Sequence, residues 1–167
     1  FREHPVSFLM ARIFELHDRS KFKIYAYSFS SNKSDKMTQR IKESVDKFRD
    51  VKDYSDSEIV NFAHADGIDI AIDLMGYTGD ARPSIFSLRS APVQINYLGF
   101  SGTTGNEMMD FIIADKKLIL KKEENFYSEK VIYMKNSAMC CDDTMTGFKK
   151  IRKKLNNNFP KDAFIFA

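Results

Sequence analysis

The chain has 167 residues, of which 43% are hydrophobic, with 15 Phe and no Trp. This length and apolar content provide for one substantial core, which excludes intrinsic disorder and predicts a single soluble domain. The 26 basic and 23 acidic residues are interleaved and leave a net charge of only +3, which argues against nucleic-acid binding. Because no apolar run approaches the roughly 20 residues of a membrane helix, we expect a cytoplasmic protein without a membrane partner.

The first half of the chain alternates between helical and strand patterns. Apolar residues recur at helical spacing in three segments, residues 5–18, 36–47 and 56–65. Period-two alternation or short apolar runs predict strands at residues 21–29 and 48–51. The third helix is bounded most clearly, because Ser55 or Asp56 is a good N-cap and Gly67 follows its end.

The second half continues the alternation with more strands. Strands are predicted at residues 68–75, 92–98, 109–115 and 129–134. A short helix is expected at residues 81–90, with Pro83 tolerated in its first turn. This order predicts an α/β fold, a Rossmann-like doubly wound domain with a mainly parallel sheet, whose ligands bind outside the carboxyl ends of the strands.

The last part of the chain has the composition of a connector. Residues 135–161 contain turn-forming residues and one basic run, KKIRKK at 149–154, which we interpret as a solvated helix face. Residues 164–166 (FIF) have the pattern of a buried strand, and the chain does not begin with Met. We therefore expect it to be part of a longer protein. Cys140 and Cys141 are adjacent, so we expect two reduced thiols without a bound metal.

His4 is the first candidate for chemistry. It precedes Pro5, and Pro is favoured at the first position of a helix, so His4 lies at or just before a helix N-terminus. The helix dipole there disfavours the imidazolium form, which leaves a neutral ring able to accept a proton. A general base and a helix cap both fit this position, and the residues alone favour the cap.

His64 falls in the last turn of the predicted helix at 56–65, where a structural role is usual. Because Gly67 and a strand follow directly, we expect His64 near the same edge of the sheet as His4. His17, near the end of the first predicted helix, is expected at the surface.

Two glycine-rich segments each follow a predicted strand. Residues 76–83 (GYTGDARP) allow close backbone approach, and their amides could face an anion. This segment has neither the G-x-G-x-x-G pattern nor the lysine of a P-loop. Residues 98–105 (LGFSGTTG) add hydroxyl side chains after the next strand. Tight turns and ligand-binding loops both fit these segments.

Residues 64–115 resemble the catalytic region of the O-GlcNAc transferase and SPINDLY family of glycosyltransferases, glycosyltransferase family 41. The motifs that carry the resemblance are Gly-Tyr-Thr at 76–78, Arg-x-Ala-Pro-x-Gln at 89–94 and Leu-Gly-Phe-x-Gly-Thr-x-Gly at 98–105. Residues 1–10 (FREHPVSFLM) and 127–134 (YSEKVIYM) are similar to further segments of that region. The resemblance therefore covers nearly the whole chain.

The resemblance implies one lobe of a GT-B type enzyme. In that family two Rossmann-like lobes move a sugar from a nucleotide-sugar donor to Ser or Thr hydroxyls, with inversion and without a metal or other cofactor. Residues 1–134 would be the N-terminal lobe without its first strand, and residues 135–167 a connector and the truncated start of the C-terminal lobe. The rest of that lobe and a helical TPR array would belong to the full-length protein.

The resemblance also implies the roles of individual residues. His4 and His64 would be catalytic, with His4 the proton acceptor. The residues expected to border the substrate cleft, where both loops converge, are Pro5, Gly76, Tyr77, Thr78, Gly102, Thr103, Thr104 and Gly105. The expected donor is UDP-GlcNAc, with GDP-fucose open, and the acceptor is a protein or peptide. A noncatalytic protein-binding module of the same fold is the alternative.

Overall fold

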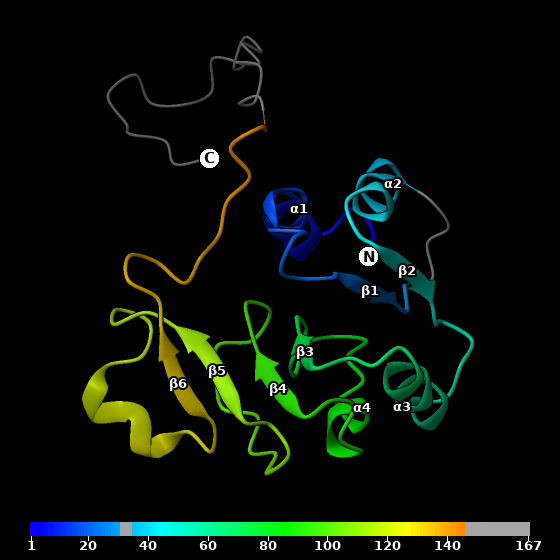
Figure 1. Cartoon of the computed structure of the whole chain (residues 1–167). Helices are drawn as coiled ribbons and strands as arrows, with labels where there is room; N and C mark the ends of the chain where they lie inside the picture. Colours follow the sequence, from blue (N-terminus) through cyan, green and yellow to red (C-terminus); the bar gives the residue numbers. More distant parts are fainter. Residues whose placement is uncertain (31–34, 146–167) are drawn as a thin grey trace, which may run out of the picture.

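Helices and strands alternate from residue 5 to residue 96 in this computed structural model, within the part of the chain that it describes (Figure 1). The structure describes residues 1–30 and 35–145. The basic run at residues 149–154 and the strand expected at 164–166 lie outside the described residues.

Within the described residues, six strands of four residues each form the framework. They are β1 (Tyr25–Ser28), β2 (Lys47–Asp50), β3 (Ile70–Asp73), β4 (Val93–Asn96), β5 (Phe111–Ala114) and β6 (Lys130–Tyr133). The helices between them are α1 (Pro5–Leu16), α2 (Lys36–Glu43), α3 (Asp56–Ala65), the single turn α4 (Ser84–Ser87) and the 3₁₀ helix η1 (Lys121–Phe126). Each predicted strand overlaps an observed one, although β2 begins one residue before its predicted start at 48, and among the described elements only η1 has no counterpart in the prediction.

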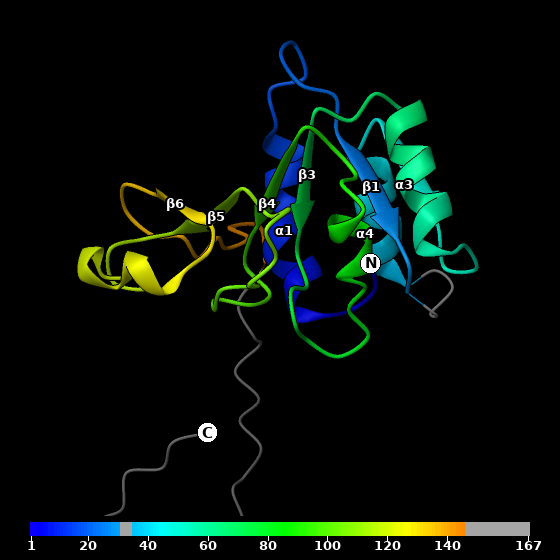
Figure 2. The same ribbon diagram turned by 90° about the horizontal axis from the view of Figure 1, so that it is seen from below.

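All strand pairs within the described residues are parallel. β1 pairs with β2 in one sheet, and β3, β4, β5 and β6 follow one another in a second sheet. Figures 1 and 2 show α1 and α2 on one side of the strands and α3 and α4 on the other. The predicted α/β architecture with a parallel, doubly wound arrangement is confirmed.

The two helical layers have separate apolar cores. The buried residues of the first are Ala11, Ala26, Met37 and Ile41, from α1, β1 and α2. Those of the second are Val51, Ile59, Val60 and Ile85, from α3, α4 and the end of β2. β1 serves both layers, because Ala26 points to the first and Tyr27 packs against the second. The alternation of side chains along β1 thus places successive residues in the two layers.

Capping residues fix where the helices begin. The hydroxyl of Ser55 accepts from the backbone of Glu58, whose carboxylate accepts from the backbone of Ser55, which is a capping box at the start of α3. The carboxylate of Asp35 accepts from Thr38 N at the start of α2. These short polar contacts explain why α3 has its predicted bounds.

The predicted helix at 81–90 is shorter than expected. It is reduced to α4, because Leu88 ends the helical turn and Arg89 adopts a φ of +60°. β4 and β5 are joined by a crossover of residues 97–110 without a helix, which carries the second glycine-rich segment.

The segment after β6 returns to the α1 and α2 layer. Asp142, whose side chain has no exposed surface, pairs with Arg40 at 2.5 Å, and Asp143 pairs with Arg12 at 2.9 Å. Hydrogen bonds from Arg40 and Thr144 lower the pKa of Asp142 to about 2. Residues 142–144 are thereby attached to both helices of the first layer.

The lowered pKa of Asp142 makes this attachment sensitive to acid. A carboxyl whose pKa is depressed on folding stabilises the protein above its unfolded pKa, near 3.8, and loses that contribution as pH falls toward its folded pKa near 2. We expect the free energy of unfolding to fall less between pH 4 and pH 2 in Asp142→Asn than in the wild type. Urea unfolding at a series of pH values measures this. Asp143→Asn is the matched control, because the Asp143 side chain is 71% exposed, and an equal effect of both variants would contradict the assignment.

Candidate functional site

His4 and the loop after β3 lie at the carboxyl end of the strands. The terminal ammonium group of Phe1 donates to the hydroxyl of Ser28, the last residue of β1, and His4 follows three residues later as the N-cap of α1. Figure 2 shows the start of the chain and the loop after β3 at the same end of the strands. Ligands of parallel α/β sheets bind at the carboxyl ends of the strands. The predicted base, His4, therefore lies at the ligand-binding end of the sheet.

The His4 ring caps its own helix. Its Nδ1 accepts a hydrogen bond of 3.4 Å from Val6 N, near the upper limit for such a bond, and Pro5 follows as the first helical residue. The side chain of His4 is half-buried. The cap predicted from the residues is present, and a contact this long leaves the ring accessible to a second partner.

His64 lies at the opposite edge of the sheet. It is near the end of α3, which leads to the amino end of β3, and its Nε2–H donates to the carbonyl of Arg89 at 2.9 Å, just before β4. The expectation that His64 and His4 share an edge is wrong. Their helices start from the same edge of the sheet, but His4 is at the start of one and His64 at the end of the other.

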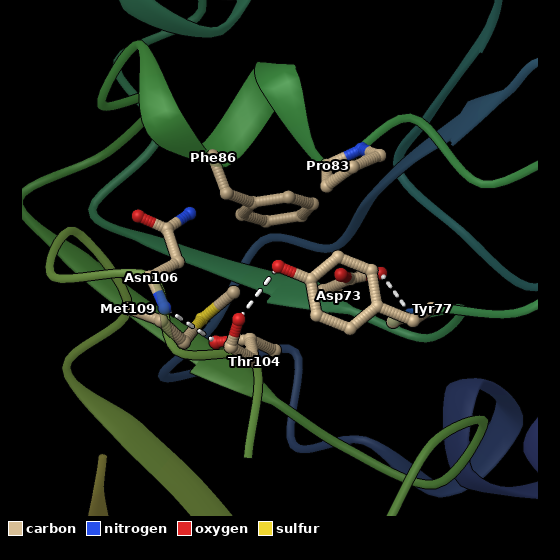
Figure 3. Close-up of a pocket in the computed structure, with 8 residues that line it drawn as sticks. Asp73, Tyr77, Pro83, Phe86, Thr104, Asn106 and Met109 are labelled. Carbon is tan, nitrogen blue, oxygen red and sulfur yellow. Dashed lines mark hydrogen bonds between the residues drawn. The ribbon is translucent and has the colours of Figure 1, made fainter. Parts of the chain in front are cut away.

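The two glycine-rich segments contact each other directly. The hydroxyl of Tyr77 donates to the carbonyl of Thr104 at 2.6 Å (Figure 3). The Tyr77 ring packs edge-to-face against Phe100. Tyr77 remains 52% exposed. The prediction that the segments converge is confirmed for these residues.

Close backbone packing explains the glycines at this junction. A Cβ on Gly76, which has a φ of +56°, would lie 2.4 Å from Cβ of Phe100. A Cβ on Gly99 would lie 2.1 Å from the carbonyl oxygen of Leu74. The absence of a side chain at each glycine therefore allows the other segment to approach closely. A side chain at either position would force the segments apart.

Asp73, the last residue of β3, binds the backbone at the start of the first glycine-rich segment. Its carboxylate accepts from the backbone amides of Met75 at 2.8 Å and Gly76 at 3.1 Å. Burial raises the pKa of Asp73 in spite of these bonds. The sequence prediction missed Asp73, although an acidic residue ending an apolar strand just before a glycine was a usable signal.

The threonines of the second segment are bound by Glu129. This buried carboxylate accepts from Thr104 N and from the hydroxyls of Thr103 and Thr104. These hydrogen bonds lower the pKa of Glu129 against the effect of burial. Because Glu129 directly precedes β6, the threonines lie toward the amino end of β6, and Thr104 is buried. Sequence analysis missed Glu129, which lies 25 residues from Thr104.

The other segment residues have local roles. The hydroxyl of Thr78 donates to the carbonyl of Met75 at 2.9 Å, and Thr78 is exposed. Gly105 has a φ of +61°, and its amide donates to the hydroxyl of Thr103. A Cβ on Gly102 would lie 2.9 Å from the ring of Phe100. These contacts maintain the turn and leave Thr78 and Tyr77 as the outward-facing side chains.

The space beneath the two segments is too small for a substrate. A cavity of about 10 Å³ is lined by Asp73, Gly76, Tyr77, Pro83, Phe86, Thr104, Asn106 and Met109 (Figure 3). That is room for roughly one water molecule. No ligand larger than a water molecule fits beneath these loops.

Comparisons with known proteins agree on one family. The family described as glycosyl transferase family 41 matches residues 1–163. The chain is 34% identical to a probable UDP-N-acetylglucosamine–peptide N-acetylglucosaminyltransferase, SEC, of Arabidopsis thaliana, over 100% of this chain and 18% of that protein. It is 34% identical to the Caenorhabditis elegans UDP-N-acetylglucosamine–peptide N-acetylglucosaminyltransferase, over 85% of this chain and 12% of that protein.

A solved structure is similar as well. A mutant of Thermobaculum terrenum O-GlcNAc transferase superposes with a TM-score of 0.80 at 33% identity, covering 83% of this chain and 26% of that chain. The chain thus spans about a quarter or less of the length of these similar proteins.

Substitution of Gly76 tests the junction between the segments. We expect Gly76→Ala to lower the free energy of unfolding by more than Gly67→Ala does. Gly67 also has a positive φ, +66°, but no atom lies within 4 Å of its added Cβ. Gly67→Ala therefore measures the conformational cost alone, about 1–2 kcal/mol, and Gly76→Ala adds a steric cost of about 1–3 kcal/mol. Equal losses in urea unfolding would show that the close packing contributes nothing.

Proposed function

Because the chain belongs to glycosyl transferase family 41, we propose that the protein of which it forms part transfers N-acetylglucosamine from UDP-N-acetylglucosamine to Ser or Thr hydroxyls of proteins. The observation that supports this most is the family match over residues 1–163, together with a half-buried histidine at the ligand-binding edge of the sheet. We further propose that residues 1–134 act as one lobe and that a second lobe completes the site.

His4 is the proposed proton acceptor. The hydroxyl oxygen of the acceptor attacks the anomeric carbon, the bond from that carbon to the phosphate oxygen of UDP breaks, and the configuration inverts. The hydroxyl proton passes to His4, and UDP leaves with the bonding electron pair. The proposed reaction uses no resident metal or cofactor.

The cap contact limits which ring nitrogen accepts the proton. While Nδ1 accepts from Val6 N, a neutral ring carries its proton on Nε2, so Nε2 has no free lone pair. His4 then either takes the proton at Nδ1 and releases Val6 N, or exchanges tautomer first. The contact is 3.4 Å long, so the loss of this weak bond costs little.

The two loop segments are proposed to bind substrate from their outer surface. Tyr77 presents an exposed aromatic ring, and Thr78 an exposed hydroxyl. Pro5 is exposed beside His4. The residues that support this surface from within are Gly102, Thr103, Thr104 and Gly105. Glu129 binds the two threonines, and Phe100 lies against Gly102.

His64 is a separate proposal. Its ring is exposed but engaged with the carbonyl of Arg89 at the amino edge. We propose that any effect of His64 on catalysis acts through the turn before β4, as a positioning residue.

A pair of substitutions at His4 separates catalysis from capping. His4→Asn keeps a good N-cap but removes the base, whereas His4→Ala removes both. In the full-length protein we expect both variants to lower kcat/KM for transfer from UDP-N-acetylglucosamine by about 10²–10⁴-fold. Only His4→Ala is expected to lower the free energy of unfolding, by about 0.5 kcal/mol, the low end for a lost N-cap, because the contact that it removes is 3.4 Å long.

The test measures transfer of radiolabelled sugar to a protein acceptor by His4→Asn and His4→Ala. His64→Ala is measured in parallel. Wild-type activity in His4→Asn would show that His4 is only a cap. Activity with GDP-fucose in place of UDP-N-acetylglucosamine would change the proposed donor. Acceptor binding without turnover of either donor would favour a noncatalytic protein-binding module.

The 167-residue chain alone is expected to be inactive. In the described residues no glycine-rich loop has the pattern of a phosphate cradle, and the cavity under the loops is too small for a nucleotide. We expect no sugar transfer by the purified chain and only weak binding of UDP-N-acetylglucosamine by calorimetry. Turnover by this chain would refute the proposal that a second lobe is needed.

A further inference from the structure

Residues 116–126 form a basic segment at one end of the four-stranded sheet. They lie between β5 and β6 and include η1. Figures 1 and 2 show η1 beside β6 and away from the four α-helices. Because β6 is the last strand in the order β3-β4-β5-β6, the basic segment lies at the outer end of the described sheet.

The backbone of the basic segment is held against β5. Ile119 is buried and packs with apolar residues of that strand. The carboxylate of Asp115 accepts from the backbone amides of Lys117 and Leu118, at 2.8 and 3.0 Å. Leu118 and Leu120, the neighbours of Ile119, are both exposed. The anchoring of Ile119 therefore directs the two leucines outward.

The basic segment carries positive charge that the described residues do not neutralise. Four exposed lysines stand at positions 116, 117, 121 and 122. Lys121 pairs with Glu124 at 2.8 Å, and the other three form no ion pair with any residue that the structure describes. Glu123 accepts from the backbone amide of Leu120. Three lysines are thus available to an anionic partner.

Apolar side chains are exposed among these lysines. Phe126 is 76% exposed, Leu118 48% and Leu120 40%. Exposed apolar residues are common singly, but three in one short segment form a patch that a partner can cover. Residues 116–122 read KKLILKK, so a pair of lysines stands on each side of the exposed leucines.

We propose that the basic segment binds an acidic segment of a partner protein, in which carboxylates flank apolar side chains. The carboxylates pair with the three unpaired lysines, and the apolar side chains cover the exposed leucines and Phe126. Complementary charge sets the register of the partner, and the apolar contacts add affinity. This interaction goes beyond the proposed transfer reaction and does not depend on it.

The mixed character of the basic segment favours a polypeptide over other anionic partners. Glu123 and Glu124 would repel a nucleic-acid backbone or an anionic lipid surface, whereas a peptide can alternate carboxylates with apolar groups. The aliphatic leucines offer no ring on which a base could stack. Helices that lie on membranes bury a large apolar face, whereas η1 has only six residues.

Binding of a labelled peptide to the full-length protein tests the proposal. The probe is the peptide EELFLEE, and the control peptide KKLFLKK has the same apolar centre with the opposite charge. Fluorescence anisotropy is measured at low and at high NaCl concentration. We expect saturable binding of EELFLEE that weakens as salt is raised, because salt screens exposed charge pairs. No binding of KKLFLKK is expected.

Charge reversal within the basic segment locates the binding site. The double variant Lys117→Glu, Lys122→Glu is expected to raise the Kd for EELFLEE by at least about tenfold. The matched control, Lys23→Glu with Lys36→Glu, changes the net charge equally at two other exposed lysines. It is expected to change the Kd by less than about twofold, because distant exposed charges are screened.

An apolar substitution separates burial from charge. We expect Leu118→Ser to raise the Kd by about threefold or more, through loss of buried apolar area. Leu16→Ser, at the exposed end of α1, is the control that leaves the Kd unchanged. All these positions are exposed, so the variants are expected to fold as the wild type does.

Three outcomes would overturn the proposal. Equal weakening by the two charge-reversal variants would show that only net charge matters. Binding to the 167-residue chain but not to the full-length protein would show that another part of the same protein covers the basic segment. Tighter binding of an RNA oligonucleotide or of anionic lipid vesicles, lost in the variant at Lys117 and Lys122, would assign the segment to that partner instead.

Discussion

Parallel pairing is the constraint on which the rest of this structure depends. Every strand pair in the described part of the chain is parallel, so the chain must cross from the carboxyl end of one strand back to the amino end of the next. Segments that leave strands therefore gather at one edge, and those that approach strands gather at the other. His4 lies at the first edge and His64 at the second, although both stand at a helix end. Topology, more than local sequence, decides which histidine can meet a ligand.

The two glycine-rich loops that follow β3 and β4 are shaped by their packing against each other. Gly76 admits Phe100, and Gly99 admits the backbone of Leu74. Tyr77 then reaches Thr104, and two buried carboxylates, Asp73 and Glu129, bind amides or hydroxyls at either end of this arrangement. Each contact limits the freedom of the next. The outer surface is therefore held in place by these contacts, which would reduce the ordering cost of the ligand binding that we propose there.

Local rules predicted much of the fold and less of the site. The capping signal at Ser55 gave the start of α3, and Gly67 gave its end, because both act over a few residues. The predicted helix at 81–90 was too long, since Arg89 takes a left-handed conformation and its side chain binds the carbonyls of Pro92 and Met108. Such tertiary contacts override propensity. Glu129 could not be predicted for the same reason, since the threonines that it binds are far away in sequence.

The hydrogen bonds that the side chains already make also bear on the chemistry that we propose for each part of the chain. A proton acceptor needs one lone pair at the carboxyl end of the strands, and the proposed acceptor, His4, lies there at a helix start that its neighbour Pro5 helps to define, with its Nδ1 lone pair in only a long contact with Val6 N. A nucleotide needs several converging donors, whereas here the hydroxyls of Thr103 and Thr104 are already bound to Glu129. These groups have little capacity left for phosphate oxygens, because a ligand would have to displace a buried carboxylate. The described residues therefore fit the proposed acceptor and its proton better than the nucleotide, for which we propose donors from a second lobe.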